Sequence, residues 1–73
     1  MSVNVHTPKK TQEEFEHLPA LVSRSVFQEW TGLGDRALRQ LVEEQKIEVY
    51  RRSEKSYARY YKREIGELMG FRM

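Results

Sequence analysis

The chain has 73 residues, 38% of them hydrophobic and 33% charged, with a net charge of +2 and no cysteine. This length predicts one small domain, and the lack of cysteine excludes disulfides and thiolate metal sites. Every apolar run falls short of the roughly 18 residues of a membrane span, and the N-terminus has no signal-peptide pattern. A cytoplasmic protein without membrane contact is therefore expected.

The N-terminal part divides into an arm and a first helical turn. Residues 1–12 are expected to form a flexible arm and residues 13–73 the folded domain, because the first residues show no sustained periodicity. At the boundary, Thr11 and Glu14 have the spacing of a capping box. They predict a short helix that places Phe15 against the core and ends before the next proline.

A second helix is predicted to begin after Ser23, which suits an N-cap. Val22, Val26 and Trp30 recur at intervals of four residues, as on one face of a helix. The spacing predicts a helix of about eight residues that ends at the sequence TGLG, residues 31–34.

A third helix is predicted over residues 35–45, where the apolar residues again have helical spacing. These residues are Ala37, Leu38, Leu41 and Val42. Gly32, in the preceding turn, can adopt a positive φ or allow a close approach of the two helices. Two amphipathic helices joined by such a turn form a helix-turn-helix. An ordinary helical hairpin has the same pattern, so the turn by itself leaves both interpretations open.

After residue 46, apolar and polar residues alternate, a repeat of two that is typical of strands. Ile47 and Val49 predict a first strand, and residues 51–56 predict a polar turn. Residues 57–61 predict a second strand whose Tyr60 faces the core.

A final helix is predicted over residues 63–69, where Ile65, Leu68 and Met69 are expected to be buried, and Phe71 adds a last core contact. The order is then helix, turn, helix, two-stranded hairpin and helix. The predicted fold class is α+β, mainly α, in the form of a small winged helix-turn-helix whose hairpin is the wing.

The outward face of the third helix carries side chains suited to nucleic-acid bases. The residues predicted to contact bases are Asp35, Arg36, Arg39 and Gln40. Arginine bonds bidentately to guanine and glutamine to adenine, and the first residues of a recognition helix face the base edges. The alternative is a plain solvated face, because Asp35 and Arg39 form an i, i+4 pair that any exposed helix can carry. The position after the turn favours DNA contact.

Positive charge is concentrated in and after the predicted hairpin. Six cations, opposed by one glutamate, lie between Arg51 and Arg63. Such charges repel one another, so contact with phosphate explains them better than stability does. The residues predicted to contact the DNA backbone or to act in the wing are Ser23, Ser25, Arg51, Arg52, Lys55, Tyr57 and Arg59. Capping also explains Ser23, and strands favour tyrosine without any ligand.

Other chemistries have little support in the sequence. His6 and His17 have no further ligands at suitable spacing, so no metal site is expected. The sequence contains no recognisable nucleophile and base and no glycine-rich phosphate loop. We therefore expect no enzymatic activity, no cofactor and no small-molecule ligand.

Residues 21–51, LVSRSVFQEWTGLGDRALRQLVEEQKIEVYR, resemble the small winged-helix DNA-binding domains of the excisionase and MerR-like superfamily. The likeness extends over residues 20–69. The matching positions are Leu21, Ser23, Gly32, Leu33, Leu38, Leu41, Val42, Ile47 and Arg51. Three positions depart from the family pattern: Arg24 is usually apolar, Gly34 is usually a serine or threonine cap, and Gln45 is usually glycine.

The resemblance implies that the helix starting at Asp35 enters the major groove of double-stranded DNA and that the hairpin touches the adjacent minor groove. It implies an excisionase-like architectural role in recombination, in a phage or mobile element, with a recombinase or further copies of the chain on repeated sites as partners. A small phage-type transcription regulator is the alternative within the family. Two alternative functions lie outside this family. One is a winged-helix module that binds another protein, and the other is a protein that binds single-stranded nucleic acid by stacking bases on its tyrosines.

Overall fold

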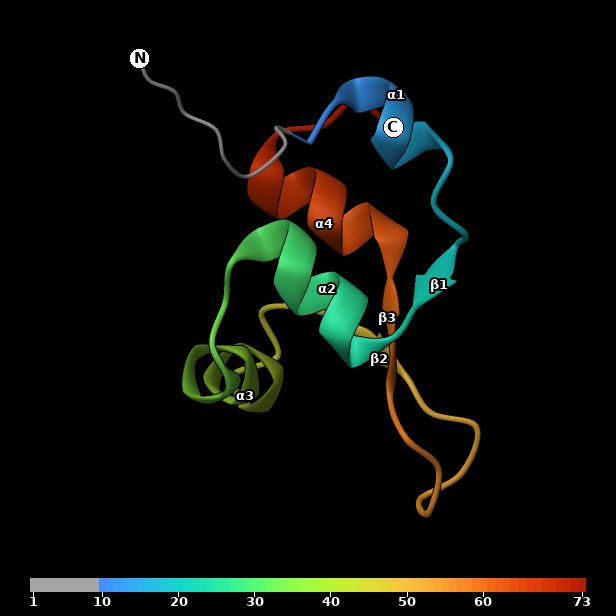
Figure 1. Ribbon diagram of the computed structural model, residues 1–73. Helices are drawn as coiled ribbons and strands as arrows, with labels where there is room; N and C mark the ends of the chain where they lie inside the picture. Colours follow the sequence, from blue (N-terminus) through green and yellow to red (C-terminus); the bar gives the residue numbers. More distant parts are fainter. Residues whose placement is uncertain (1–9) are drawn as a thin grey trace.

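A computed structural model describes residues 10–73 and has the small, mostly helical α+β fold that the sequence predicts (Figure 1). Residues 1–9 of the predicted arm lie outside the described residues, and the last two residues of that arm, Thr11 and Gln12, cap and begin the first helix. The elements of the described part are α1 (Gln12–Glu16), β1 (Leu21–Val22), α2 (Arg24–Thr31), α3 (Asp35–Glu43), β2 (Val49–Tyr50), β3 (Arg59–Tyr61) and α4 (Lys62–Met69). No helix among them has the length and apolar composition that crossing a membrane requires.

Side chains close α1 at both ends. Thr11 and Glu14 form the predicted capping box, in which each side chain accepts a hydrogen bond from the backbone N–H of the other residue. At the opposite end, the Lys62 ammonium donates to the carbonyl oxygens of Glu16 (3.0 Å) and Leu18 (3.2 Å). The two hydrogen bonds from Lys62 attach α1 to the start of α4. A helix of five residues depends on such tertiary contacts for its stability.

α2 begins and ends where the sequence predicts. The hydroxyl of its N-cap, Ser23, accepts from the Val26 N–H, and Gly32 ends the helix with a φ of 74°. Glycine adopts this left-handed conformation without strain. Val22, predicted as the start of the apolar stripe of this helix, lies instead in β1, where it pairs with Tyr60 and is buried. A strand at that position faces the same core, which explains why the apolar spacing suggested a helix.

The three strands form an antiparallel sheet in the order β1-β3-β2. β2 and β3 make the predicted hairpin, in which Val49 pairs with Tyr60. Both strands are shorter than predicted: Ile47 is buried but precedes β2, and β3 begins only at Arg59. The connecting residues 51–58 therefore form a long tip that extends away from the rest of the molecule (Figure 1).

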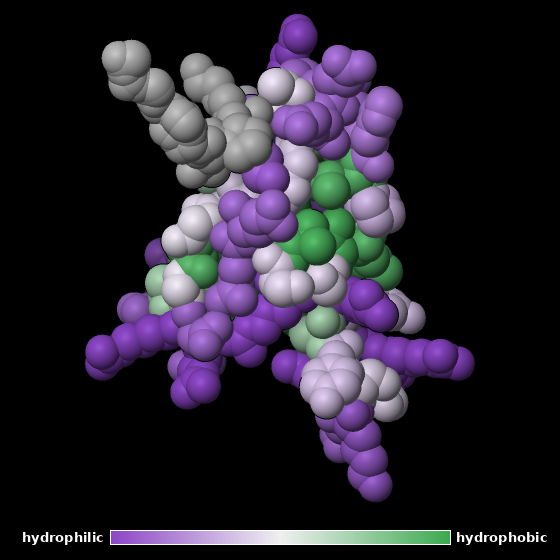
Figure 2. All heavy atoms as spheres, in the orientation of Figure 1, coloured by the Kyte–Doolittle hydropathy of each residue, from purple (hydrophilic) through white to green (hydrophobic). Residues whose placement is uncertain are grey.

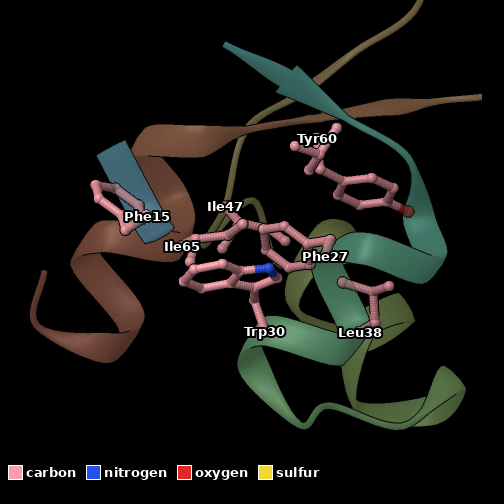
Figure 3. Packing of buried hydrophobic residues seen from close by; sticks show 8 residues of the cluster. Phe15, Phe27, Trp30, Leu38, Ile47, Tyr60 and Ile65 are labelled. Atoms are coloured by element: carbon pink, nitrogen blue, oxygen red, sulfur yellow. The ribbon is translucent and has the colours of Figure 1, made fainter. Parts of the chain in front are cut away.

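The core gathers side chains from all the helices and from the sheet (Figure 3). Its buried hydrophobic residues are Phe15, Val22, Phe27, Trp30, Leu38, Ile47, Tyr60 and Ile65. The ring of Phe27 stacks on that of Tyr60, with centroids 4.8 Å apart. Tyr60 thus lies in the core as predicted, and α2 is joined directly to the hairpin.

The end of α4 differs from the prediction. Leu68 and Met69 were expected to be buried but are 43% and 47% exposed. Gly70 ends the helix with a φ of 82°, and the chain then turns back so that Phe71 stacks on Phe15 with centroids 4.8 Å apart. Phe71, as predicted, supplies the last core contact, and it packs against both Phe15 and Trp30.

α3 is two residues shorter than predicted, because the chain leaves the helix at Gln45, where φ is 59°. Ala37 was expected in the core but is exposed. The helix contacts the core along a narrow stripe made by Leu38, which is buried, and by Leu41 and Val42, which are partly buried.

The left-handed residue after α3 gives a prediction for stability. Gln45→Gly is expected to raise the free energy of unfolding by up to about 1 kcal/mol, because a side chain at positive φ costs about 1–2 kcal/mol and the extra flexibility of unfolded glycine offsets only part of this gain. Gln45→Val, which places a β-branched side chain there, should lower it. Urea unfolding of both variants tests the signs. A less stable glycine variant would contradict the geometry.

Candidate nucleic-acid interface

The cationic side chains of α3 project away from the core. Arg36 and Arg39 are exposed, and neither forms an ion pair within residues 10–73. Leu38, which lies between them in the sequence, is only 1% exposed. Gln40 is exposed as well, and its amide group donates to the Glu44 carboxylate at 2.9 Å. α3 therefore buries one face and presents guanidinium groups and an amide on the other.

Asp35, also predicted to contact bases, is bound to α2. Its Oδ1 accepts hydrogen bonds from Gln28 Nε2 at 2.8 Å and from Arg24 Nη2 at 3.1 Å. The hydrogen bond from Gln28 and the positive charge of Arg24 hold the pKa of Asp35 below its ordinary value of 3.8. Arg39, the expected i, i+4 partner, has the smallest effect on this pKa. Asp35 thus joins the start of α3 to α2 across the turn.

The lowered pKa of Asp35 predicts how stability depends on pH. A carboxyl group whose pKa is lower in the folded than in the unfolded chain stabilises the fold above the unfolded pKa, and this contribution is lost as the pH falls through the folded value. We expect Asp35→Asn to be less stable than the wild type at neutral pH, with a difference that disappears as the pH falls below 3.8.

Urea midpoints measured across the acidic range test this expectation. Glu43→Gln is the matched control, since Glu43 is an exposed carboxylate of the same helix with no ion pair inside the described part of the chain. A difference between Asp35→Asn and the wild type that stays constant with pH would show that the charge of Asp35 does not stabilise the fold.

The tip of the hairpin carries exposed cations but is tied together internally. The exposed residues of interest on the tip and at the adjoining start of β3 are Arg51, Arg52, Lys55, Tyr57 and Arg59. The four cations in this list, which are all of its residues except Tyr57, form no ion pair within residues 10–73. Arg51 Nη1 donates to the Ser56 carbonyl at 3.2 Å, the Ser56 N–H donates to the Ser53 carbonyl at 3.1 Å, and the two serine hydroxyls lie 3.0 Å apart. Arg51 therefore shapes the tip as well as adding charge.

A groove between the tip and the start of α2 collects most of the residues predicted to contact the DNA backbone. Its volume is about 730 Å³. The predicted residues that line it are Ser23, Ser25, Arg51, Tyr57 and Arg59. Arg24 and Asp35 also line it and are paired with each other, so Arg51 and Arg59 leave the groove with an excess of positive charge.

The two remaining backbone candidates, Arg52 and Lys55, line a second groove of about 340 Å³. Tyr57 and Arg59 line both grooves. The exposed tyrosine thus borders two grooves that both contain cations.

The base candidates Arg36, Arg39 and Gln40 line neither groove. α3 and the tip nevertheless lie at the same end of the molecule, opposite α1 and the C-terminus (Figure 1). Figure 2 shows long hydrophilic side chains extending from that end. The two predicted contact regions are therefore neighbouring surfaces rather than one pocket.

Sequence reasoning missed Arg24 and Gln28 as part of this site. Both side chains of α2 contact Asp35, and Arg24 forms an ion pair with it. Helical periodicity relates residues three or four apart. A contact between residues 11 apart that spans a turn leaves no such signal.

The side chains gathered at these surfaces are guanidinium, ammonium, hydroxyl and amide groups with one paired carboxylate, a set that binds anions. Within residues 10–73, no three His, Cys, Asp or Glu side chains are placed to hold a metal ion, and His6 lies outside that range.

Comparison with models of protein families finds no match for the chain, and neither a curated protein nor a solved structure matches it.

Proposed function

We propose that this chain is a winged helix-turn-helix protein that binds double-stranded DNA sequence-specifically in the cytoplasm, in the manner of an excisionase and without enzymatic activity. In this assignment α2 and α3 are the helix pair, α3 is the recognition helix, and the β2–β3 hairpin is the wing. The short α2, the left-handed Gly32 and the buried face of α3 support it.

The observation that carries the proposal is the placement of unpaired positive charge. Two arginines on α3, three cations on the hairpin tip and Arg59 at the start of β3 are exposed, without ion pairs in the described residues, at one end of the molecule (Figure 1). A helix flanked by a basic hairpin can place side chains on base edges and on phosphates at the same time. Among residues 10–73, the cations that do form ion pairs are Lys10, Arg24 and Arg63.

The α3 side chains have the chemistry for reading bases in the major groove. Arg36 and Arg39 can each bond bidentately to a guanine, and Gln40 can bond to an adenine once it releases Glu44. Asp35 has a different role in this scheme. Its two contacts join the start of α3 to α2, so we assign it a supporting role in holding the helix pair together rather than contact with a base.

The groove beside α2 has the chemistry for a phosphate of the DNA backbone. Arg51 and Arg59 supply charge, and the hydroxyls of Ser23 and Ser25 lie 3.3 Å apart on the opposite wall. Arg52 and Lys55 extend the positive surface toward the adjacent minor groove, whose negative potential attracts such side chains.

A single module of this kind buries roughly 600–1,000 Å² of protein surface on DNA, which is small for tight specific binding. We therefore propose that it binds cooperatively, either as several copies on repeated sites or together with a recombinase. A transcription regulator would bind DNA through the same residues. A protein-interaction module would instead use the basic tip on an acidic protein surface.

The salt dependence of binding to a random-sequence duplex tests the proposal against the protein-interaction alternative. If about four phosphates are contacted, the plot of log affinity against log salt has a slope of about −3.6. Arg72→Ala is the control, because Arg72 is an exposed residue at the opposite, C-terminal end without an ion pair within residues 10–73. The absence of duplex binding at low salt would reject DNA as the ligand.

A further inference from the structure

The ring of Tyr57 is unusually free for an aromatic side chain in so small a protein. It is 95% exposed, whereas Tyr60 is buried, Tyr50 is 41% exposed and the ring of Tyr61 lies against the Arg63 guanidinium at 4.5 Å. No stacking or cation–π contact within residues 10–73 involves Tyr57. Since an aromatic side chain can bury about 150–250 Å², the free protein leaves this contact area unused.

The backbone on both sides of Tyr57 is held in place. Ser56 is tied by the Arg51 guanidinium and by two contacts to Ser53. Ala58 packs against the core. Ala58 is partly buried whereas Tyr57 is 95% exposed, so the two neighbouring side chains face in different directions. The ring is therefore presented by the fold and does not result from a loose tip.

The surroundings of the ring define the ligand that would suit it. Tyr57 and Arg59 line both grooves, whereas Arg51 lines only the first and Arg52 and Lys55 line only the second. A flat ring that projects free of protein contacts, with cations in both neighbouring grooves, suits a ligand that combines stacked flat rings with negative charge close by. The minor groove of a DNA duplex has this arrangement, with base edges on its floor and a phosphate strand on each side.

We propose that Tyr57 inserts its ring into the base stack of duplex DNA from the minor groove, with the cations of the two grooves on the flanking phosphates. This inference rests on the proposed DNA-binding function and adds a role for the ring, where the sequence suggested contact with the backbone. Other minor-groove proteins insert apolar side chains between base steps in this way and partly unstack them.

A mismatch tests insertion, because it lowers the cost of unstacking before the protein binds. The probes are a short random-sequence duplex and the same duplex with one central mismatch flanked by 2-aminopurine, whose fluorescence rises on unstacking. We expect the wild type to prefer the mismatched duplex by about tenfold or more, because a mismatch removes part of the few kcal/mol that unstacking costs in a paired duplex. Tyr57→Ala should bind both duplexes equally and leave the fluorescence unchanged.

Two further variants separate insertion from other roles. Tyr57→Phe keeps the ring and should keep both the preference and the fluorescence change, whereas a hydroxyl that donates to phosphate would be lost. Met73→Ala removes another exposed apolar side chain, 76% exposed and close to Gly66 of α4, and should behave as wild type. Circular dichroism of each variant checks that the fold is intact.

The possible failures have different meanings. Three outcomes would overturn the insertion but not DNA binding. Tyr57→Ala could keep the preference for the mismatched duplex, or Tyr57→Phe could lose it. The third outcome is tighter binding of the unpaired single strand than of either duplex. Absence of wild-type binding to both duplexes at low salt would overturn insertion and the proposed function together.

Discussion

Phe27→Ala is expected to lower the free energy of unfolding by about 3–5 kcal/mol, the range found when a large buried aromatic residue is truncated. Phe27 has no exposed surface and stacks on Tyr60. A chain of 73 residues has a total stability of about 4–11 kcal/mol at roughly 0.05–0.15 kcal/mol per residue. The variant should therefore be close to unfolding, and DNA binding should weaken with it because Phe27 connects the helix pair to the hairpin.

Urea unfolding followed by circular dichroism measures this loss. Phe27→Leu keeps most of the buried apolar volume and should lose clearly less stability. Leu68→Ala removes a side chain that is 43% exposed and should change stability much less than Phe27→Ala does. Comparable losses for Leu68 and Phe27 would show that the core is not centred on α2 and the hairpin.

Arg39→Ala and Arg52→Ala are expected to weaken DNA binding in different ways. Arg39 lies on α3, so its loss should cost about 1–3 kcal/mol at the preferred site and relax the sequence preference there. Arg52 lies on the tip, so its loss should weaken binding to every duplex similarly and reduce the salt slope by about one. Both side chains are exposed, so neither variant should alter the fold.

The preferred site is first selected from random duplexes with the wild-type protein. Each variant is then titrated on that site and on an unrelated duplex at several salt concentrations. Equal losses for both variants on both duplexes would mean that α3 contributes charge but does not read bases.

Elements with strong local signals could be predicted from the sequence. The capping box of Thr11 and Glu14, the Ser23 cap and the left-handed Gly32 are each specified by residues close together in the chain. Tyr60 could be placed in the core because a strand alternates its faces. These signals set where the helices and the hairpin lie, and so they brought most of the predicted backbone residues to one groove.

Features that depend on distant residues could not be predicted. β1 exists because Leu21 and Val22 pair with a strand about 40 residues later, and two residues are too few to show a period. Leu68 and Met69 continue the helical spacing of Ile65 but are exposed, and the core contact comes from Phe71 after the helix has ended, which no helical spacing reveals.

The role of Asp35 illustrates the same limit for the candidate site. Its type and its place at the start of a helix suggested base contact, and its i, i+4 neighbour Arg39 suggested an ion pair. The turn instead brings it to Arg24 and Gln28. The angle between two helices decides such contacts, and that angle depends on the packing of the whole core.

The backbone amide signals of the protein, followed by NMR during titration with a random-sequence duplex, test the central claim most directly. We predict that the largest shifts occur at the start of α3 around Arg36 and Arg39 and at the hairpin tip around Lys55 and Arg59, while α1 and the end of α4 change little. Shifts concentrated near Leu68 and Met69, or on only one of the two predicted surfaces, would contradict a single DNA interface formed by α3 and the hairpin.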